Sequence, residues 1–370
     1  MLTKSSGITS ITSNPFKARI LEAILEWSRA GASDIHIFYD RPQNTIIEVR
    51  LNMYLSEVFR GQASHYKSYR IAIFELLKLD PMRDDDTMDQ SITIDHFDFR
   101  VNYLPTKNGG AFVLRVIDRL KKFSLDSYPM PVDEKDRLRS VLNKAKGLII
   151  VTGPTGSGKS SLMMNGLSSV VGQGRNIMSL EEPVEYRLEG IRQTEIEEGK
   201  PLTFQRALRA VLRQDPCVVF VGEVRDRETA ETCIKLANKG HLTLATLHTN
   251  SAMGAIEALT DEGVDEKKLR KALLYLSGQM LVPKLCQKCL IDDPEGSKDL
   301  QEEFGELISA KISNGCSHCK ETGRSGKVLL FESVYFKRGV EKASPTMVER
   351  GLDFVRKEVI SAKTLLSHTA

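Results

Sequence analysis

The hydrophobic and polar positions of the chain follow two different patterns, and the change between them divides the sequence. Apolar residues recur at helical spacing over residues 15–30 and near residues 66–79. Around these stretches lie short runs with strand patterning, at residues 34–39, 45–52, 91–95, 97–104 and 111–117. The pattern predicts a small α/β domain over residues 1–120.

From about residue 147 the apolar residues instead form short continuous runs. The runs are GLIIVTG, RNIMSLEE, CVVFVGE and HLTLATLHT, and helix-compatible segments separate them. Continuous apolar runs are typical of parallel strands that are covered on both faces, so we expect a doubly wound α/β sheet over residues 141–284. Residues 121–140 lose the periodicity and contain two prolines, which favours a linker. A cysteine-rich module (285–335) and a helical tail (336–370) are expected to follow.

Composition limits the class of protein. The 370 residues, of which 41% are hydrophobic, are enough for two cores, and 52 basic against 49 acidic side chains leave a net charge of +3. This balance indicates no nucleic-acid partner. No apolar stretch typical of a secretion signal or a membrane span is found, so we expect neither. Cys217 and Cys233 are isolated, and we expect both to have apolar surroundings and to be inert fillers.

The stretch GPTGSGKSS predicts a phosphate-binding loop. Gly153, Gly158, Lys159 and Ser160 fit G-x-x-x-x-G-K-[ST] between an apolar strand and a helix-compatible run. Glycines let backbone N–H groups close on phosphates, while the lysine reaches the β and γ oxygens and the serine hydroxyl coordinates Mg²⁺. The expected nucleotide-binding residues are Gly153, Pro154, Thr155, Gly156, Ser157, Gly158, Lys159, Ser160 and Ser161. The alternative is a glycine-rich turn without a ligand.

Carboxylates stand at the ends of two further predicted strands. Glu223 follows the run VVFVG, where a carboxylate can hold Mg²⁺ directly or through its waters; a solvated charge is the alternative. Glu181, Glu182 and Glu185 crowd the end of another strand, and like charges this close repel each other unless a cation or a catalytic task holds them. We expect Glu181 to be the base that activates the attacking water.

His248 ends the fourth predicted strand, in the stretch ATLHTNSA. At this edge of the sheet a histidine can sense the γ-phosphate and connect the nucleotide state to the sheet. A structural hydrogen-bonding role is the alternative, and the residue alone favours it.

Four cysteines form two C-x₂-C pairs, Cys286 with Cys289 and Cys316 with Cys319, separated by 26 residues. Each pair can supply two corners of a zinc tetrahedron, so together they predict a structural Cys₄ zinc site. A longer intervening loop adds little to the cost of closing it. Redox dithiols and unpartnered thiols are alternatives, and His318 could replace one cysteine.

Taken together, these stretches resemble the assembly ATPases of type II secretion systems and type IV pili, in the wider superfamily of RecA-like hexameric motors. GPTGSGKS resembles the Walker A box, SLEEPVEY the Asp box, LRQDPCVVFVGEVRD the Walker B region, GHLTLATLHTNSA the His box, and GASDIHI the opening of the amino-terminal domain. The resemblance implies a RecA-like P-loop core, a smaller PAS-like α/β domain and a tetracysteine zinc module. It also favours the sensor role of His248.

The resemblance further implies roles for arginines. Arg100 and Arg115 match two family arginines on strands that face the nucleotide when the domains close, and a guanidinium can neutralise several phosphate oxygens. The alternative is two surface arginines. Arg206, Arg209 and Arg213 are expected near a subunit interface, and their spacing predicts a shared helical face.

The sequence departs from the family pattern at several positions. Glu182 replaces the aspartate of the Asp box, NGGAF near Gly110 replaces Gly-Glu-Lys/Arg, Cys217 replaces an aspartate and Met280 replaces an arginine. We also expect the extra amino-terminal domain of long family members to be absent, and recruitment to use another surface.

The resemblance implies a cytoplasmic, hexameric, Mg²⁺-dependent ATPase that is peripheral to the inner membrane. It would work against a membrane platform protein to assemble a type IV pilus or a type II secretion pseudopilus. The tetracysteine motif favours assembly over retraction. A DNA-translocating or conjugative ATPase, a retraction ATPase and a nucleotide-gated scaffold are the alternatives; the near-neutral charge counts against the first, and the intact Glu181, Glu223 and Arg115 count against the last.

Overall fold

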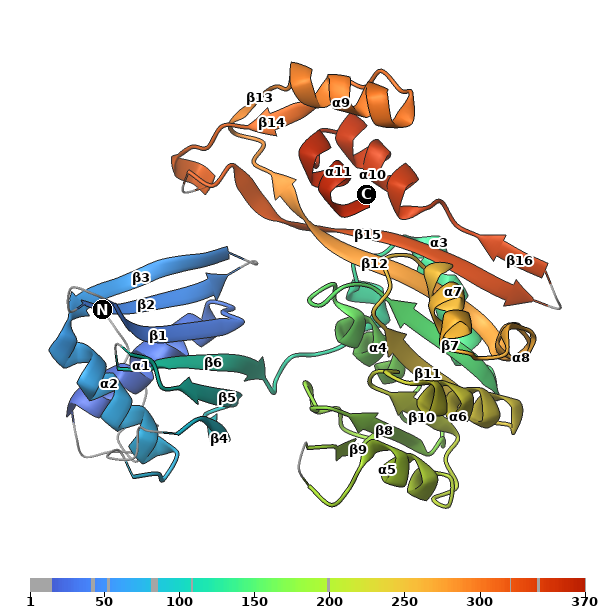
Figure 1. Cartoon of the computed structure of the whole chain (residues 1–370), viewed down its shortest axis with the longest axis horizontal. Coiled ribbons are helices and arrows are strands. Elements are labelled where there is room, and N and C mark those ends of the chain that lie inside the picture. The colour runs from blue at the N-terminus through green and yellow to red at the C-terminus, as the bar shows by residue number, and fades with distance from the viewer. Residues whose placement is uncertain are drawn as a thin grey trace. The chain divides into compact units, whose positions relative to one another are not determined.

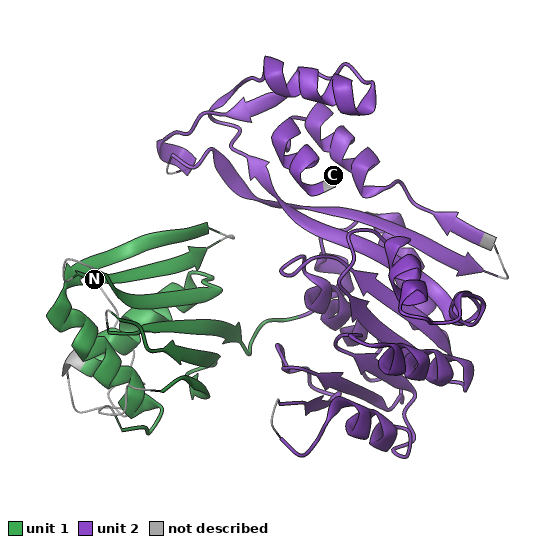
Figure 2. Ribbon diagram, viewed as in Figure 1, with its two compact units in different colours: residues 1–122 green, residues 123–370 purple. Residues whose placement is uncertain are grey.

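The computed structural model describes residues 15–40, 44–51, 54–80, 86–107, 109–197, 200–319, 321–337 and 340–369. The chain divides into two compact units, residues 1–122 and 123–370 (Figures 1 and 2). The segment at the amino terminus, where we expect no secretion signal, lies outside the described residues. In the part of the chain that is described, none of the helices combines the length and apolarity needed to cross a membrane.

The first unit is one antiparallel sheet with two helices. Its strand order is β3-β2-β1-β6-β5-β4. The strands are β1 (Asp34–Asp40), β2 (Asn44–Leu51), β3 (Tyr54–Gln62), β4 (Met88–Ile94), β5 (Phe97–Leu104) and β6 (Ala111–Asp118), and the helices are α1 (Pro15–Arg29) and α2 (Ala63–Leu76). Alternate residues of β5, such as Phe99 and Val101, are buried with both helices in one core, which leaves Arg100 on the opposite face.

The strand β3 was absent from the sequence-based prediction. It is an edge strand, paired only with β2 among the described strands, and most of its side chains are exposed on both faces. Without a buried face it carries no alternation of apolar and polar residues, so the pattern that predicts the other strands is missing here.

The second unit contains an eight-stranded sheet of order β16-β15-β12-β7-β11-β10-β8-β9. The strands are β7 (Gly147–Thr152), β8 (Ile177–Glu181), β9 (Arg192–Glu195), β10 (Val218–Val221), β11 (Leu242–Leu247), β12 (Leu273–Leu285), β15 (Arg324–Lys337) and β16 (Val340–Ala343). From β12 to β9 all neighbouring strands are parallel, whereas β15 and β16 are antiparallel to their neighbours.

Both faces of this sheet are covered, as the continuous apolar runs predicted. Every residue of β7, β8, β10 and β11 is buried. Neighbouring residues alternate between two cores: Leu148 and Ile150 pack with α5 to α8, whereas Ile149 and Val151 pack with α3 and α4. The helices are α3 (Val132–Leu142), α4 (Lys159–Ser168), α5 (Phe204–Val211), α6 (Arg227–Asn238), α7 (Gly254–Asp261) and α8 (Glu266–Ala272).

The segment expected to be a linker, residues 121–140, lies mostly within the second unit. Leu125, Tyr128 and Met130 are buried in the core beneath α4, and α3 begins at Val132. Their irregular spacing produces no sequence period, although each residue fills a place in the core. The division between the units falls after Lys122.

The region after β12 forms a third packing layer within the second unit (Figure 1). A two-stranded sheet, β13 (Leu290–Asp292) with β14 (Lys311–Ser313), accompanies α9 (Pro294–Phe304). The helices α10 (Met347–Arg356) and α11 (Ala362–Thr369) share a core with α9 and with residues of β12 and β15. The helical tail is therefore packed against the cysteine-bearing region, and β15 belongs to the large sheet.

Candidate functional site

A glycine-rich loop joins β7 to α4. Gly153 has φ +148°, and a Cβ atom there would lie 2.2 Å from the carbonyl oxygen of Gln279. Gly158 has φ +90° and caps the start of α4 in the left-handed region. Residues other than glycine rarely adopt these backbone conformations. The glycines therefore allow a tight loop that leads directly into the amino terminus of a helix.

Two side chains from distant parts of the second unit hold this loop. Gln279 Nε2 donates to the Ser157 carbonyl at 2.8 Å and to the Tyr128 hydroxyl oxygen at 3.1 Å. The Tyr128 hydroxyl lies 3.3 Å from the Gly158 carbonyl that it donates to, and burial raises the pKa of Tyr128 to about 12, so it stays protonated. Sequence reasoning missed both residues, and no local motif marks Tyr128.

The inside of the loop carries polar groups suited to an anion. Lys159 is only 8% exposed, and its ammonium donates to the carbonyls of Gly153 at 2.6 Å and Pro154 at 3.1 Å. Burial lowers the pKa of Lys159, while the Glu223 and Glu185 carboxylates oppose that shift. The buried Ser157 hydroxyl oxygen has no hydrogen-bond partner among the described residues. A buried polar atom without a partner is costly unless a ligand satisfies it.

Glu223 lies just beyond β10 at the centre of an ionic network. Its Oε1 is 2.8 Å from His248 Nε2, and its Oε2 is 2.6 Å from Arg225 Nε. Arg225 also binds Glu182, with Nη1 to Oε2 at 2.7 Å. His248 Nδ1 lies 3.5 Å from Lys159 Nζ. The structure therefore brings three predicted residues, Lys159, Glu223 and His248, into one network, and adds Arg225, which sequence reasoning missed.

Glu181 ends β8 beside this network. A Cβ atom on Gly222 would lie 3.1 Å from the Glu181 Cα, so the ends of β8 and β10 are in close contact. Glu181 is 4% exposed, and its Oε1 accepts hydrogen bonds from Ser179 Oγ at 2.6 Å and Gln193 Nε2 at 3.0 Å. Burial raises the pKa of Glu181, and nearby carboxylates raise it further. A carboxylate with a raised pKa is suited to general-base catalysis.

In the first unit, Arg100 and Arg115 belong to a row of charged residues. Arg100 stands opposite Arg115 on the paired strands β5 and β6, and Asp34 on β1 stands opposite both Arg115 and Arg50. Asp34 Oδ1 is 3.2 Å from Arg115 Nε, and Oδ2 is 3.3 Å from Arg50 Nε. Arg100 Nε is 3.2 Å from Asp89 Oδ1. Asp34 therefore holds one predicted arginine in place, and Asp34 and Arg50 are additions to the predicted set.

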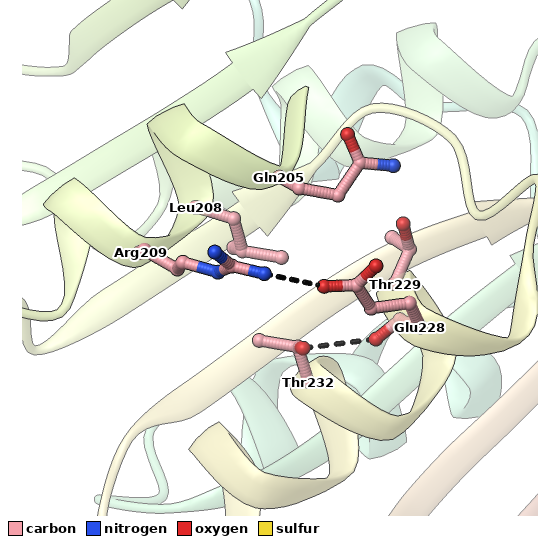
Figure 3. A pocket seen from close by; sticks show the side chains of 6 residues that line it. All are labelled: Gln205, Leu208, Arg209, Glu228, Thr229 and Thr232. Atoms are coloured by element: carbon pink, nitrogen blue, oxygen red, sulfur yellow. Dashed lines mark hydrogen bonds and ion pairs between the residues drawn. The ribbon is translucent and has the colours of Figure 1, made fainter. Parts of the chain in front are cut away.

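The three arginines expected at a subunit interface do not share one helix. Arg206 and Arg209 are on α5, whereas Arg213 lies in the turn that follows it. Arg209 pairs with Glu228 of α6 at 2.9 Å, beside a hollow of about 10 Å³ (Figure 3). This hollow is too small to hold a nucleotide.

The four paired cysteines come together in the region after β12. Their Sγ atoms all lie within 4.8 Å of one another, at 4.0 Å for Cys286 and Cys316, 3.9 Å for Cys289 and Cys319, and 3.8 Å for Cys316 and Cys319. A tetrahedral zinc site with Zn–S bonds of about 2.3 Å has edges of about 3.8 Å. All four are free thiols. The geometry and the donor set fit a Cys₄ metal site.

Backbone groups favour the thiolate form of Cys319. The N–H groups of Cys316 and Gly323 donate to Cys319 Sγ, each at 3.2 Å. Burial alone would raise the pKa of Cys319, but these donors and the neighbouring Cys316 and Cys286 lower it to about 6. In contrast, burial and the neighbouring cysteines raise the pKa of Cys289 to about 12. His318 is exposed and stands outside the cluster.

The two isolated cysteines differ from each other. Cys233 is buried, and burial raises its pKa to about 12, which agrees with an inert residue. Cys217 is exposed, so the expectation of apolar surroundings was wrong for it. Cys217 directly precedes β10, whose own residues, from Val218 onward, are all buried.

Comparison with known proteins identifies the family. The family described as "Type II/IV secretion system protein" matches residues 11–362. The chain belongs to this family. The resemblance inferred from the motifs is thereby confirmed.

Individual secretion proteins resemble the chain over most of its length. It is 39% identical to type II secretion system protein E of Pectobacterium carotovorum subsp. carotovorum, over 88% of this chain and 66% of that protein. It is 32% identical to type II secretion system ATPase E of Vibrio cholerae, over 95% of this chain and 75% of that protein. It is 33% identical to the type IV pilus assembly ATPase PilB of Thermus thermophilus, over 85% of this chain and 36% of PilB. The chain thus spans about two thirds of its type II secretion relatives.

Solved structures of a pilus retraction motor and of another ATPase share the fold. The pilus retraction motor PilT with bound ADP matches with a TM-score of 0.62 and 25% identity, over 95% of this chain and 88% of PilT. The ATPase DotB of Yersinia pseudotuberculosis matches with a TM-score of 0.72 and 17% identity, over 100% and 97%. The second likeness supports the fold alone.

The raised pKa of Glu181 predicts a pH dependence of stability. The folded state binds this proton more tightly than the unfolded chain, so the contribution is present below the unfolded pKa and is lost as the pH rises through the folded pKa. The wild type should therefore lose stability relative to Glu181→Gln as the pH is raised from about 4 to about 8. Urea unfolding of both proteins across this range measures the difference.

Glu189 provides the control, because it lies in the connection between β8 and β9 but is exposed to solvent. Glu189→Gln therefore removes a carboxylate that is not buried. The difference between that variant and the wild type should stay nearly flat with pH. An equally flat difference for Glu181→Gln would contradict the buried-carboxylate interpretation.

Proposed function

We propose that this chain is a Mg²⁺-dependent ATPase whose hydrolysis drives assembly of a type IV pilus or a type II secretion pseudopilus. The observation that carries the proposal is the glycine-rich loop with its buried Lys159, in contact with the network of Glu223 and His248. The family supports it, because relatives in Vibrio cholerae and Thermus thermophilus are named as a secretion ATPase and a pilus assembly ATPase. The related PilT structure contains ADP.

In this proposal the second unit is a RecA-like P-loop core. The loop from Gly153 to Gly158 and the start of α4 bind the nucleotide phosphates, with Lys159 as the charged partner and Ser160 and Ser161 at the first turn of the helix. Ser160 and Glu223 are the residues that would hold Mg²⁺, which when bound neutralises charge on the phosphates. The unpaired Ser157 hydroxyl is a further candidate donor to a phosphate.

Glu181 is the proposed base for the attacking water. Of the neighbouring carboxylates, Glu182 forms an ion pair with Arg225, whereas within the described residues Glu181 accepts hydrogen bonds from the neutral side chains of Ser179 and Gln193. Burial raises the pKa of Glu181. A buried carboxylate without a cationic partner is the stronger base of the two. His248, between Glu223 and Lys159, is placed to respond to the γ-phosphate and to pass that state to the loop that follows it.

The first unit is proposed to be a PAS-like domain that completes the site with Arg100 and Arg115. Both stand on the face of the sheet opposite the hydrophobic core, each paired with an aspartate whose place an anionic ligand would take or share. Asp34 keeps Arg115 oriented and lowers the repulsion between Arg115 and Arg50.

We further propose that the motor is a hexamer on the cytoplasmic side of the inner membrane, where it acts on a platform protein. The cysteine cluster is proposed to bind zinc and to stabilise the region that meets this partner. Retraction is the main alternative, because PilT is a retraction motor. Deleting the gene should abolish the filament if the chain assembles it and should leave excess filaments if the chain retracts them. Hydrolysis stimulated by DNA would instead favour a DNA-translocating or conjugative ATPase.

Substitutions at the second unit test the catalytic assignments. Lys159→Ala should abolish turnover by removing the phosphate contact, and Glu223→Gln should do so by weakening the Mg²⁺ site. Glu181→Gln should bind ATP normally but lose hydrolysis, because it removes the base alone. Phosphate release and binding of a fluorescent nucleotide measure the two properties. The exposed Lys144→Ala is the matched control, and normal turnover in Glu181→Gln would remove the base assignment.

Substitutions at the first unit test whether its arginines act on the reaction. Arg100→Ala and Arg115→Ala should each lower kcat by about 10²-fold or more with little effect on nucleotide affinity, because the arginines act mainly on the transition state. Asp34→Asn should lower kcat less, by loosening Arg115. Arg29→Ala, which removes an exposed arginine of α1, is the control. Unchanged kcat in both arginine variants would mean that the first unit does not complete the site.

The cysteine cluster predicts about one zinc ion per chain. Metal analysis of protein purified without added zinc should detect it, and replacing Cys286 together with Cys289 by serine should remove it. The exposed Cys217→Ser should keep it. We expect zinc loss to unfold the region of β13, α9 and β14 first, with ATP binding preserved and capture of the platform protein lost. Disulfides in place of metal would contradict the zinc assignment, and capture of the platform protein at wild-type strength would contradict the docking role.

A further inference from the structure

One carboxylate outside the proposed catalytic set joins two segments that are distant in the sequence. Glu332 lies on β15, and its Oε1 accepts a hydrogen bond from the Ala252 backbone N–H at 2.6 Å. Its Oε2 accepts from the Met347 N–H at 2.9 Å. Ala252 belongs to the loop between His248 and α7, and Met347 is the first residue of α10. One side chain therefore binds the loop after His248 and the start of the carboxy-terminal helices.

The surrounding sequence allows this reach across the sheet. Gly278 on β12 stands opposite Glu332 in the β12–β15 register. A Cβ atom on Gly278 would lie 2.8 Å from the Ala252 nitrogen and 3.1 Å from Glu332 Oε1. The missing side chain lets the loop backbone approach the strand and the carboxylate pass over it. Ala252 is only 2% exposed, so its N–H depends on Glu332 for a partner.

The same loop is tied to the phosphate-binding segment on its other side. The Thr152 hydroxyl, at the end of β7 directly before Gly153, donates to the Ser251 carbonyl at 3.2 Å. A continuous series of bonds thus runs from the start of the glycine-rich loop, through Ser251 and Ala252, to Glu332 and then to α10. Bonds to a carboxylate are stronger than neutral ones, and the start of a helix favours a negative charge.

The loop and the helix do not fill the space between them. A cavity of about 260 Å³ is lined by Asn250 and Ser251 of the loop, by Met347 and Val348 of α10, and by Glu332 on its wall. Either segment has room to shift, so Glu332 provides a connection where the cavity interrupts the packing.

We propose that Glu332 is a positioning residue that couples the loop carrying His248 to the docking of α10, so that nucleotide binding stabilises α10. The proposal rests on the function proposed above, because it takes the loop after His248 to respond to nucleotide. Coupling free energies between sites commonly change affinity by about 5-fold to 150-fold, and they act equally in both directions. The contiguous hydrogen-bonded path provides the physical route for this coupling.

Hydrogen exchange of the full-length protein tests the coupling. The readout is the protection of α10 amides 350–355, which do not bond to Glu332, with and without a non-hydrolysable ATP analogue and Mg²⁺. In the wild type the analogue should raise this protection by about fivefold or more. Glu332→Gln keeps the shape of the side chain but can accept only one of the two hydrogen bonds. In this variant the ratio of α10 protection with and without the analogue should fall close to one. Because the coupling is reciprocal, the same variant should also bind the analogue more weakly, by a factor similar to the lost protection.

Matched variants separate coupling from general damage to α10. Glu349→Ala removes the capping box of α10, in which Glu349 binds the Thr346 N–H at 2.7 Å, and leaves Glu332 untouched. It should loosen α10 but keep the response to nucleotide. Met347→Pro removes the N–H that Glu332 accepts, at a position where proline suits a helix, together with a buried side chain. It should lose the response, whereas Met347→Ala, which removes the side chain but keeps the N–H, should keep it.

The outcomes distinguish the two proposals. A wild type that binds the analogue and hydrolyses ATP, but whose α10 protection does not respond, overturns the coupling and leaves the ATPase function intact. A full response in Glu332→Gln and Met347→Pro does the same. A wild type that binds no nucleotide overturns both proposals.

Discussion

The candidate site depends on the register of the parallel strands in the second unit. Thr152 of β7 is level with Leu247 of β11, and Val221 of β10 is level with both Ala245 of β11 and Leu180 of β8. The residues that follow these positions therefore emerge at one edge of the sheet. Because backbone hydrogen bonds fix the register, the glycine-rich loop, Glu181, Glu223 and His248 are brought together before any ligand is present.

This arrangement brings charged groups close together at the edge of a buried sheet, where burial and mutual repulsion are unfavourable. Glu181 is almost fully covered and its pKa is raised, whereas Glu223 and Glu182 are compensated by His248 and Arg225. Charge pairing of this kind also occurs in the first unit, where Asp34 forms ion pairs with two arginines, Arg50 and Arg115. Such pairing offsets the repulsion between like charges that lie close together.

Sequence patterns predicted the elements whose structure is determined by residues close together in the sequence. Continuous apolar runs predicted the covered parallel strands, and the glycine spacing predicted the tight loop, because both follow from backbone geometry. The contacts of Tyr128 and Gln279 with that loop were not predictable, since they come from segments 151 residues apart that meet only in the folded core. The edge strand β3 was missed because it buries neither face. Asp34 was missed because cross-strand register, which a single sequence does not display, gives it its partners.

The strand β12 connects the cysteine region to the part of the second unit that carries the glycine-rich loop. Its first half pairs in parallel with β7, and its second half extends beyond β7 with β15 as partner. Gln279, which supports the glycine-rich loop, and Cys286, which opens the cysteine cluster, are thus connected by one short stretch of extended chain. The Leu285 N–H also donates to the Val359 carbonyl at 2.8 Å, just before α11. The register of the β12–β15 pairing shifts between Pro283 and Leu285, but β15 remains the partner of β12 on both sides of the shift. The carboxy-terminal layer is therefore joined to the glycine-rich loop through one strand, as the proposed motor function requires.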